Sequence, residues 1–367
     1  MVIAIVAHES IKIVQFDVEL NPEKFNLSSF LDQEYSNIDL FDRTRKFATF
    51  YKLYKKSDKF AYFMPRESSK GPRVNIRRKR SNGRNDYIMM GSNDYLGLSC
   101  HPKVIEAAKT AIDEYGVGAT GTPPTSGTSD LHEKLCKKLA SMYDKEAALV
   151  YPSGFGANSG SIACLCREQD LIVADFLSHT SLQEGIMASR AAYRFFKHND
   201  MDHLEKTLSE NRSKYFGCLI VTEGLFSMDG TIGQMDAIVK LAKKYDARVF
   251  IDQGHCIGVL GDKGLGTIEK FNVIDSTDMV MGLFSKGLGT MGGFIAADES
   301  VIQWLKVYSK THVFATTFPP SNAAATLAAI EIMETQPELR TKLISNVKLF
   351  VKGLVEMGAL IDPNHYT

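Results

Sequence analysis

The sequence feature that most constrains the fold is a regular alternation of short apolar runs and longer amphipathic stretches, which begins at Tyr87. The runs are rich in β-branched and apolar residues, as in buried strands, and the stretches between them have the period of helices. The runs are residues 147–150, 171–174, 193–196, 218–222, 248–251 and 279–282. Repetition of strand and helix predicts an α/β fold with a mainly parallel central sheet and flanking helices.

The first 86 residues have a different character. They are polar and irregular, with a helical patch at 41–54 and a stretch rich in Gly, Pro and Arg at 68–84, so we expect an N-terminal extension or arm. The basic run at 73–84 is best explained as a solvated loop. Nucleic-acid binding is less favoured there, because no aromatic residues interleave the basic ones.

Composition narrows the class of protein. Of 367 residues 44% are hydrophobic, Lys+Arg and Asp+Glu both number 43, and the net charge is zero, which gives no support for a nucleic-acid partner. The six cysteines are scattered, with neither a disulfide framework nor zinc-ligand spacing, so we expect reduced thiols in the cytoplasm and no metal. No apolar run approaches the ~18 residues of a membrane span, and no export signal is recognised.

In parallel α/β sheets ligands bind beyond the carboxyl ends of the strands, so the residues after each apolar run are the candidates for chemistry. A glycine-bearing turn at 152–158 leads into a helix and predicts an anion site. Asp252 follows the run at 248–251, with His255 three residues later, and Lys286 lies in a glycine-framed loop after 279–282. Each feature alone has an ordinary explanation, such as a surface lysine.

Together these three features predict a pyridoxal phosphate site. The amine of Lys286 would form the imine, the carboxylate of Asp252 would keep the pyridine nitrogen protonated, and the turn would anchor the phosphate. Glycines beside Lys286 would let the backbone approach the cofactor closely. His179, which follows the run at 171–174, would stack on the ring, although a capping or core histidine is the commoner explanation of such a residue.

Motifs that carry a family resemblance occur in order between Tyr87 and Leu354. They are GSNDYLGL at 91–98, SGT at 126–128 with His132, SGFGAN at 153–158, LSH at 177–179, HND at 198–200, TEGLFSMDG at 222–230, DQGH at 252–255, FSK at 284–286 and FPP at 318–320. In these motifs the chain resembles the α-oxoamine synthase family of fold-type I pyridoxal-phosphate enzymes. That family includes serine palmitoyltransferase, aminooxononanoate synthase, aminolevulinate synthase and aminoketobutyrate CoA ligase.

The resemblance implies roles for four catalytic residues. Lys286 would be the Schiff-base lysine and would transfer protons, and Asp252 would pair with the pyridine nitrogen. His255 would hydrogen-bond the ring hydroxyl oxygen, and His179 would stack on the ring. The domain division implied is an arm at 1–86, a large cofactor-binding domain at 87–335 and the start of a small C-terminal domain at 336–367.

The resemblance also implies further contacts to cofactor and substrate. The phosphate would be held by Ser153, Gly154 and Phe155, while Ser227 would lie near the ring oxygen and Ser285 would belong to the cofactor-binding lysine loop. Asn93 would contact substrate from the neighbouring subunit. Thr316 and Thr317 would reach across the dimer towards the phosphate, so a homodimer or closely related heterodimer with shared active sites is expected.

The implied reaction is a condensation of an amino acid with an acyl-CoA, decarboxylative in most members. The imine would lower the pKa of the α-C–H of the amino acid, and Lys286 would remove that proton. The carbanion would then attack the thioester carbonyl. The stretch at 196–201 and the N-terminal arm favour a member similar to serine palmitoyltransferase.

The chain departs from the family pattern in three places. Leu283 stands where the family has a threonine, which removes one hydroxyl donor to the phosphate. Pro123 and Pro124 stand where many members carry an arginine or other polar residues. Relatives continue beyond the equivalent of 361–363 into a domain that supplies an arginine for the substrate carboxylate, whereas this sequence stops at Thr367; we therefore expect a truncated sequence, since the helix expected at 336–357 would otherwise expose an apolar face.

Other functions stay open at this point. One is an aminotransferase or amino-acid lyase of the same fold, and another is a weakly active or regulatory subunit of a heteromeric synthase. The retained Lys286 argues against a regulatory subunit, because the non-catalytic relatives lack that lysine. A pure binding module is the least favoured, because many reactive side chains coincide at strand ends.

Overall fold

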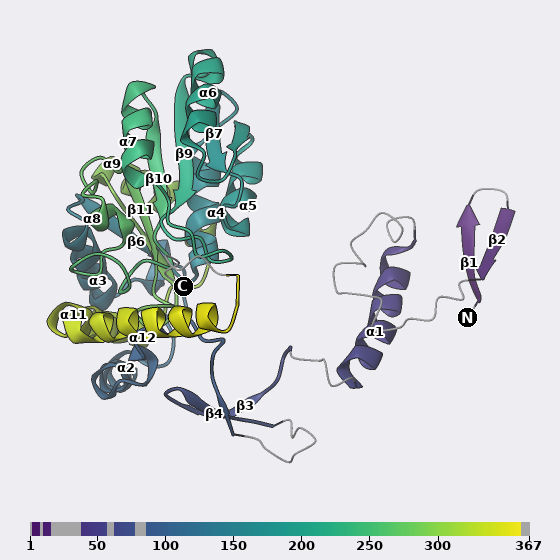
Figure 1. Ribbon diagram of the computed structural model, residues 1–367, viewed down its shortest axis with the longest axis horizontal. Helices are drawn as coiled ribbons and strands as arrows, with labels where there is room; N and C mark the ends of the chain where they lie inside the picture. Colours follow the sequence, from purple (N-terminus) through teal and green to yellow (C-terminus); the bar gives the residue numbers. More distant parts are fainter. Residues whose placement is uncertain (1, 8–9, 16–37, 57–61, 78–85, 361–367) are drawn as a thin grey trace. The chain divides into compact units, whose positions relative to one another are not determined.

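The computed structural model describes residues 2–7, 10–15, 38–56, 62–77 and 86–360. The chain divides into two compact units, Met1–Met89 and Met90–Thr367 (Figure 1). The division of the chain into an arm, a large domain and a small C-terminal domain stays a prediction.

The first unit contains more regular structure than the sequence patterns predict. Strands β1 (Val2–Ala7) and β2 (Ser10–Gln15) pair antiparallel, helix α1 spans Leu40–Lys56, and β3 (Arg66–Lys70), β4 (Arg73–Ile76) and β5 (Asp86–Ile88) form an antiparallel sheet. The helical patch is confirmed. The expectation of irregular structure was wrong at β3 and β4, because Gly71, with φ of 76°, serves there as a hairpin turn rather than as a loop marker.

The second unit is built on a seven-stranded sheet of order β6-β12-β11-β10-β9-β7-β8. All six predicted strands are present, and the pairs among β7 to β11 are parallel. The strands are β6 (Ala147–Tyr151), β7 (Asp170–Asp175), β8 (Ala192–Phe196), β9 (Gly217–Glu223), β10 (Arg248–Asp252), β11 (Met279–Leu283) and β12 (Gly293–Ala297). The expected α/β fold with a mainly parallel sheet is therefore confirmed.

Strand β12 was not predicted. It lies between β6 and β11 and pairs antiparallel with both. Its short run of small residues, Gly-Phe-Ile-Ala-Ala, follows the glycines of the lysine loop so closely that the run reads as a continuation of that loop. Gly292, with φ of 101°, provides the left-handed conformation that returns the chain into the sheet.

Helices cover both faces of this sheet (Figure 1). Successive strand residues point to opposite faces, so that Ile172 joins the core beneath α4 (Gly154–Leu165), α5 (Thr180–Ser189) and α9 (Glu299–Tyr308), while Val173 joins the other core. The helices that contribute to this other core are α2 (Pro102–Tyr115), α3 (Asp130–Met142), α6 (Met201–Asn211), α7 (Met235–Lys244), α8 (Thr267–Lys270) and α11 (Pro320–Thr335).

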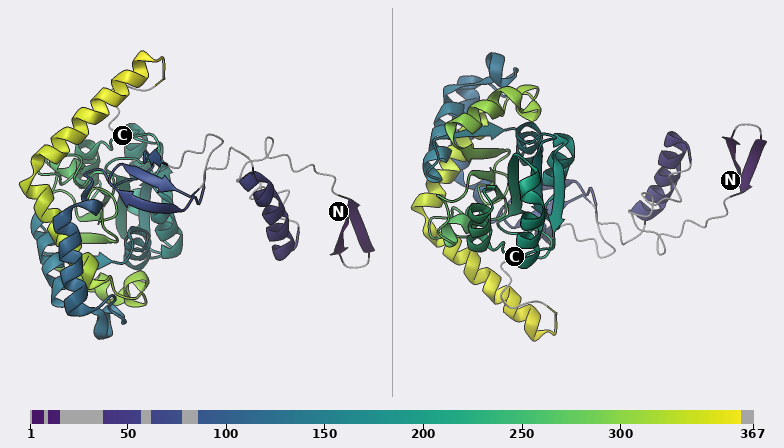
Figure 2. Two further views of the ribbon diagram at one scale, coloured as in Figure 1. Left: turned by 90° about the horizontal axis from the view of Figure 1, so that it is seen from below. Right: turned by 90° about the horizontal axis from the view of Figure 1, so that it is seen from above.

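The last described helix, α12 (Pro337–Glu356), confirms the helix expected at 336–357. It lies at the periphery of the second unit (Figure 2), and its Leu349 is 72% exposed and Phe350 55% exposed. Of the small C-terminal domain expected to start at 336–367, residues 361–367 lie outside the described residues. Within the described ranges no helix has both the length and the apolar character to cross a bilayer.

Candidate active site

The sheet brings four predicted residues to one edge. Asp252 ends β10, Lys286 lies three residues beyond the end of β11, and His255 follows Asp252 in the loop after β10. His179 caps the N-terminus of α5, after β7. Because β7, β9, β10 and β11 are neighbours and run parallel, their carboxyl ends lie side by side, as the general location of ligands in such sheets requires.

Asp252 is held rigidly. Only 7% of the residue is exposed, and both carboxylate oxygens accept short hydrogen bonds. Oδ1 accepts from the Gly254 N–H at 2.7 Å, and Oδ2 accepts from Asn158 Nδ2 at 2.7 Å. A buried carboxylate supported in this way is suited to face a protonated pyridine nitrogen.

Lys286 is partly buried, and its surroundings tune its amine. Burial lowers the pKa of the Lys286 amine below its ordinary value, while the charges of Asp252 and Glu223 oppose that shift. A lowered pKa increases the fraction of neutral amine at neutral pH. The neutral amine is the form that attacks a carbonyl carbon to make an imine.

His255 has a partner that the sequence analysis did not single out. The Tyr95 hydroxyl lies 2.7 Å from Nδ1 of His255. Burial lowers the pKa of His255 to about 3, with the neighbouring Lys286 and His179 adding to the effect, and burial raises the pKa of Tyr95 to about 12. Tyr95 lies in the motif at 91–98, but nothing in that motif indicates that its hydroxyl reaches a histidine in the loop after β10.

Glu223 was also missed, although it ends β9 and pairs in register with Asp252. Its Oε1 accepts a hydrogen bond from the backbone N–H of His179 at 2.6 Å. Burial, aided by the negative charge of Asp252, raises the pKa of Glu223 to about 8. The rule that chemistry follows strand ends would have selected Glu223, since the run at 218–222 ends directly before it.

The predicted phosphate turn forms the N-terminus of α4. Ser153 is the N-cap, and its Oγ accepts from the Gly156 N–H at 3.0 Å. The first N–H groups of a helix have no partner within it and attract anions. A Cβ at Gly154 would lie 1.7 Å from Leu283 Cδ2, so Leu283 packs directly on the turn, and Phe155 is 49% exposed.

The remaining predicted residues lie in loops. Asn93, Ser227, Ser285 and Thr316 are exposed. Thr317 is buried, and its N–H and its hydroxyl both donate to the Gly121 carbonyl oxygen, at 2.9 and 3.0 Å. The expected contacts of Asn93, Thr316 and Thr317 with a neighbouring subunit stay predictions.

The donor set at this edge fits pyridoxal phosphate. One edge of the sheet carries an amine with a lowered pKa, a fixed carboxylate, an imidazole with an exposed ring and a helix N-terminus, which are the groups that an imine, a pyridine nitrogen, a ring face and a phosphate require. Leu283 is the one poor match, because it presents methyl groups to the phosphate turn.

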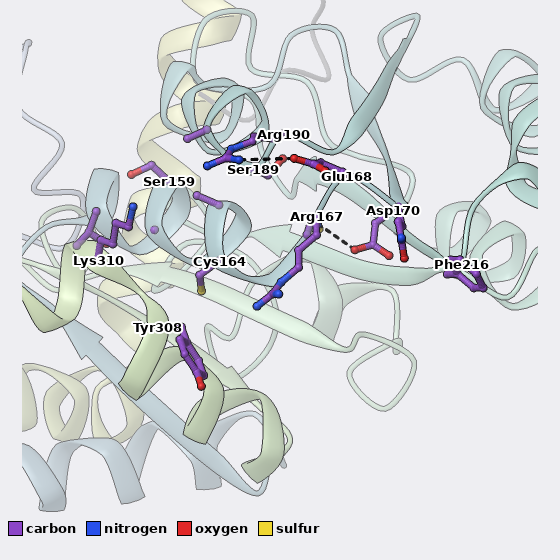
Figure 3. Close-up of a pocket in the computed structure, with 16 residues that line it drawn as sticks. Ser159, Cys164, Arg167, Glu168, Asp170, Ser189, Arg190, Phe216, Tyr308 and Lys310 are labelled. Carbon is purple, nitrogen blue, oxygen red and sulfur yellow. Dashed lines mark hydrogen bonds and ion pairs between the residues drawn. The ribbon is translucent and has the colours of Figure 1, made fainter.

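Two cavities, of about 830 and 640 Å³, lie away from the four catalytic candidates, and Thr317 lines the smaller one. The larger is bordered by the end of α4 and by α10 (Lys310–Val313), and in it Arg190 points toward Glu168 at 3.6 Å (Figure 3). Neither cavity is lined by Lys286, Asp252, His255 or His179. We assign the active site to the strand ends, because the reactive groups converge there.

Comparison with known proteins identifies the class of protein. Residues 85–365 match the model of the family described as aminotransferase class I and II. The structure superposes on serine palmitoyltransferase of Sphingomonas wittichii with a TM-score of 0.81 at 31% identity, covering 88% of this chain and 79% of that one. It also superposes, with a TM-score of 0.80 at 31% identity, on a serine palmitoyltransferase structure that holds pyridoxal phosphate, covering 88% and 79%.

The sequence relatives define the family. Serine palmitoyltransferase of Sphingobacterium spiritivorum is 40% identical over 82% of this chain and 73% of its own length. The 8-amino-7-oxononanoate synthase of Thermoanaerobacter pseudethanolicus is 40% identical over 80% and 72%. The 4-hydroxy-2,2'-bipyrrole-5-methanol synthase PigH of a Serratia species is 38% identical over 87% of this chain, which spans about half (49%) of that longer protein.

The chain belongs to the α-oxoamine synthase family of fold-type I pyridoxal-phosphate enzymes. This membership confirms the resemblance, the fold class and the cofactor that the sequence motifs predict.

Proposed function

We propose that this chain condenses an amino acid with an acyl-CoA, with pyridoxal phosphate held on Lys286. The observation that carries the proposal is the convergence of the Lys286 loop and Asp252 at the ends of the paired strands β11 and β10, in a chain of this family. The two groups interact electrostatically, since the Asp252 carboxylate raises the pKa of Lys286 against the effect of burial.

The residues at the strand ends would act on the cofactor and on the amino acid. Asp252, fixed by Asn158 and the Gly254 N–H, holds the pyridine nitrogen in its protonated form. Bound pyridoxal phosphate supplies a ring that withdraws electrons from the α-carbon of the amino acid. The Lys286 amine would take the proton from that carbon, since a lowered pKa increases the fraction of the amine in the neutral form.

The other contacts position the cofactor. His179, whose backbone is held by Glu223, would cover one ring face. His255, held by Tyr95, would hydrogen-bond the ring oxygen together with Ser227. The N-terminus of α4 would bind the phosphate through Ser153, Gly154 and Phe155, and Ser285 would contribute from the lysine loop.

We also infer how the chain assembles and where it works. It would form a homodimer in which Asn93, Thr316 and Thr317 contact the active site of the neighbouring subunit, and it would be a cytoplasmic enzyme. The exposure of Asn93 and Thr316 supports the first inference. Specificity similar to that of serine palmitoyltransferase is supported by solved relatives of that name.

The first experiment tests the lysine. Purified protein is loaded with pyridoxal phosphate, reduced with borohydride and digested, and the modified peptide is identified by mass spectrometry. We expect the label on Lys286 and none in Lys286→Ala, while the exposed-lysine control Lys240→Ala keeps the label. Label on another lysine contradicts the proposal.

The second experiment tests the reaction class. Release of carbon dioxide from carboxyl-labelled serine, glycine, alanine and threonine is measured with and without palmitoyl-CoA. Acyl-CoA-dependent release with serine supports specificity similar to serine palmitoyltransferase, and release with another of the four corrects the amino acid. Transfer of the amino group to an oxo acid without acyl-CoA would show an aminotransferase instead.

A further inference from the structure

A chain of buried hydrogen bonds connects Asp252 to His179. Asn158 Nδ2 lies 2.7 Å from Asp252 Oδ2 and 2.9 Å from Ser181 Oγ. Ser181 Oγ lies 2.8 Å from Nδ1 of His179. The two linking residues are almost fully buried, with Asn158 2% exposed and Ser181 1% exposed. Water therefore does not compete for the contacts of Asn158 with Asp252 and Ser181, whereas the contact of Ser181 with His179 is partly buried.

The Asn158 end of this chain has a fixed direction. An amide nitrogen carries two hydrogens, and here one points to the Asp252 carboxylate and the other to Ser181 Oγ. The reversed amide would place its oxygen against Asp252 Oδ2, which cannot donate while ionised. Asn158 therefore donates in both directions, and Ser181 Oγ accepts from it.

The His179 end has the same direction. The backbone N–H of Ser181 lies 3.2 Å from His179 Nδ1, and a backbone N–H can only donate. Nδ1 must therefore offer its lone pair, and the Ser181 hydroxyl hydrogen, the one hydrogen of that group, also points to Nδ1. A neutral imidazole with an acceptor at Nδ1 carries its proton on Nε2.

We propose that Asn158 and Ser181 are positioning residues that tie the pyridine-nitrogen partner Asp252 to the ring-stacking His179 and fix His179 in the tautomer protonated on Nε2. The inference rests on the proposed function, since it concerns residues assigned to the cofactor there. It goes beyond that function because it gives a defined task to the two linking residues, to which the proposed function assigns no contact with the cofactor.

Two consequences follow for the site. His179 presents an N–H rather than a lone pair on the side of its ring away from Ser181, so it can donate to an anionic or carbonyl oxygen of a substrate. Asp252 and His179 are also coupled through Asn158. Loss of the Asn158 amide would leave Asp252 Oδ2 without its amide donor and would also free the Ser181 hydroxyl, which contacts His179, to rotate.

The tautomer is tested directly by nuclear magnetic resonance of protein labelled with ¹⁵N-histidine, with His179→Gln to assign the signals. We expect His179 to show a protonated Nε2 and an unprotonated Nδ1 at neutral pH. A protonated Nδ1 in the wild-type protein overturns the proposal. This measurement needs no cofactor, so it gives an answer even if the proposed condensation activity is wrong.

Variants test the linkage in the cofactor-loaded protein. Ser181→Ala removes the closer of the two donors to Nδ1, at 2.8 Å, and leaves the backbone N–H at 3.2 Å. It is therefore expected to show a larger fraction of the His179 tautomer protonated on Nδ1 than wild type, and about 2- to 10-fold weaker retention of pyridoxal phosphate, the range for loss of one hydrogen bond. Ser181→Thr keeps the hydroxyl and should restore both readouts. Ser159→Ala is the control, because Ser159 lies on the neighbouring helix α4 and its hydroxyl donates to the Phe155 carbonyl oxygen.

A double-mutant cycle tests whether the two residues act as one unit. If they do, Asn158→Ala combined with Ser181→Ala weakens cofactor retention no more than the worse single variant. Losses that multiply, or a Ser181→Ala variant whose tautomer and retention equal those of Ser159→Ala, would show independent structural roles and overturn the proposal.

Discussion

The hydroxyl of Tyr95 lies 2.7 Å from Nδ1 of His255, which joins the segment before α2 to the loop after β10. The contact matters because burial lowers the pKa of His255 to about 3, so His255 is neutral at physiological pH and depends on hydrogen bonds rather than charge for its orientation. Tyr95 thus holds in place a residue assigned to the cofactor ring oxygen.

Tyr95→Phe is expected to weaken binding of pyridoxal phosphate about 2- to 10-fold, since one hydrogen bond of ~0.5–1.5 kcal/mol is lost and the ring packing is kept. The dissociation constant is measured from the visible absorbance of the loaded protein. Tyr193→Phe, at the partly exposed Tyr193 of β8, should leave it unchanged. Equal affinities of wild type and Tyr95→Phe would contradict this role.

Leu283 should be a natural weak point in cofactor binding. Its methyl groups pack on Gly154 and Gly254, where a Cβ would lie 1.7 and 2.7 Å from Leu283 carbons. Leu283→Thr places a hydroxyl beside the phosphate turn, and a charge-assisted hydrogen bond of ~1.5–3 kcal/mol corresponds to about 10- to 100-fold tighter binding.

Leu283→Val is the control for Leu283→Thr, because valine has the shape of threonine without the hydroxyl. The two dissociation constants for pyridoxal phosphate are compared by equilibrium dialysis. If valine and threonine give the same affinity, the hydroxyl is not what this position lacks.

Gly289 fixes the lysine loop. Its φ is +66°, and a Cβ there would lie 2.4 Å from the Ser99 nitrogen. Gly289→Ala should lower the free energy of unfolding by at least ~1–3 kcal/mol, the cost of a strained backbone conformation. Urea denaturation measures this change.

The matched substitution Gly353→Ala lies within α12, where an added Cβ meets nothing within 4 Å. It should raise the free energy of unfolding by ~0.5–1 kcal/mol, because alanine is the better helix former. If Gly289→Ala and Gly353→Ala change the free energy of unfolding by similar amounts, then Gly289 is not required for its backbone conformation or its close packing.

Glu223 should make stability depend on pH. Burial raises its pKa from 4.5 to about 8 in the folded protein, so between these values the folded chain holds a proton that the unfolded chain has released. The contribution is fully present below about pH 4.5 and is lost as the pH rises through about 8.

Glu223→Gln removes this proton equilibrium and keeps an oxygen for the His179 N–H. We expect its urea midpoint to fall less than that of wild type between pH 5 and 8, and to exceed the wild-type midpoint at pH 8. The exposed Glu331→Gln serves as the control. A midpoint that falls as steeply in Glu223→Gln as in wild type would remove Glu223 as the source.

Much of the fold could be predicted from the sequence, because strands that are buried on both faces appear as uninterrupted apolar runs. The runs before Asp252 and Lys286 became β10 and β11, so the strand-end rule placed both residues at one edge of the sheet. The motif order then identified the family, which the comparisons confirm.

Other features of the fold and the site could not be predicted, because they depend on contacts between segments that are distant in the sequence. No local pattern shows that Tyr95 meets His255, or that Asn158 faces both Asp252 and Ser181. Strand β12 was missed because a short run of small residues after glycines has no strand signal of its own. Only its pairing with β6 and β11 defines it.

The antiparallel position of β12 has a consequence for biosynthesis. In the described sheet β6 pairs only with β12, so the strand that leads into Ser153 has no neighbour until residues 293–297 have been made. A nascent chain that emerges N-terminus first therefore keeps the β12-facing edge of β6 without its strand partner while residues 152–292 are made. The strand before the phosphate turn and the strand before the lysine loop join one sheet only when this later strand is inserted between them.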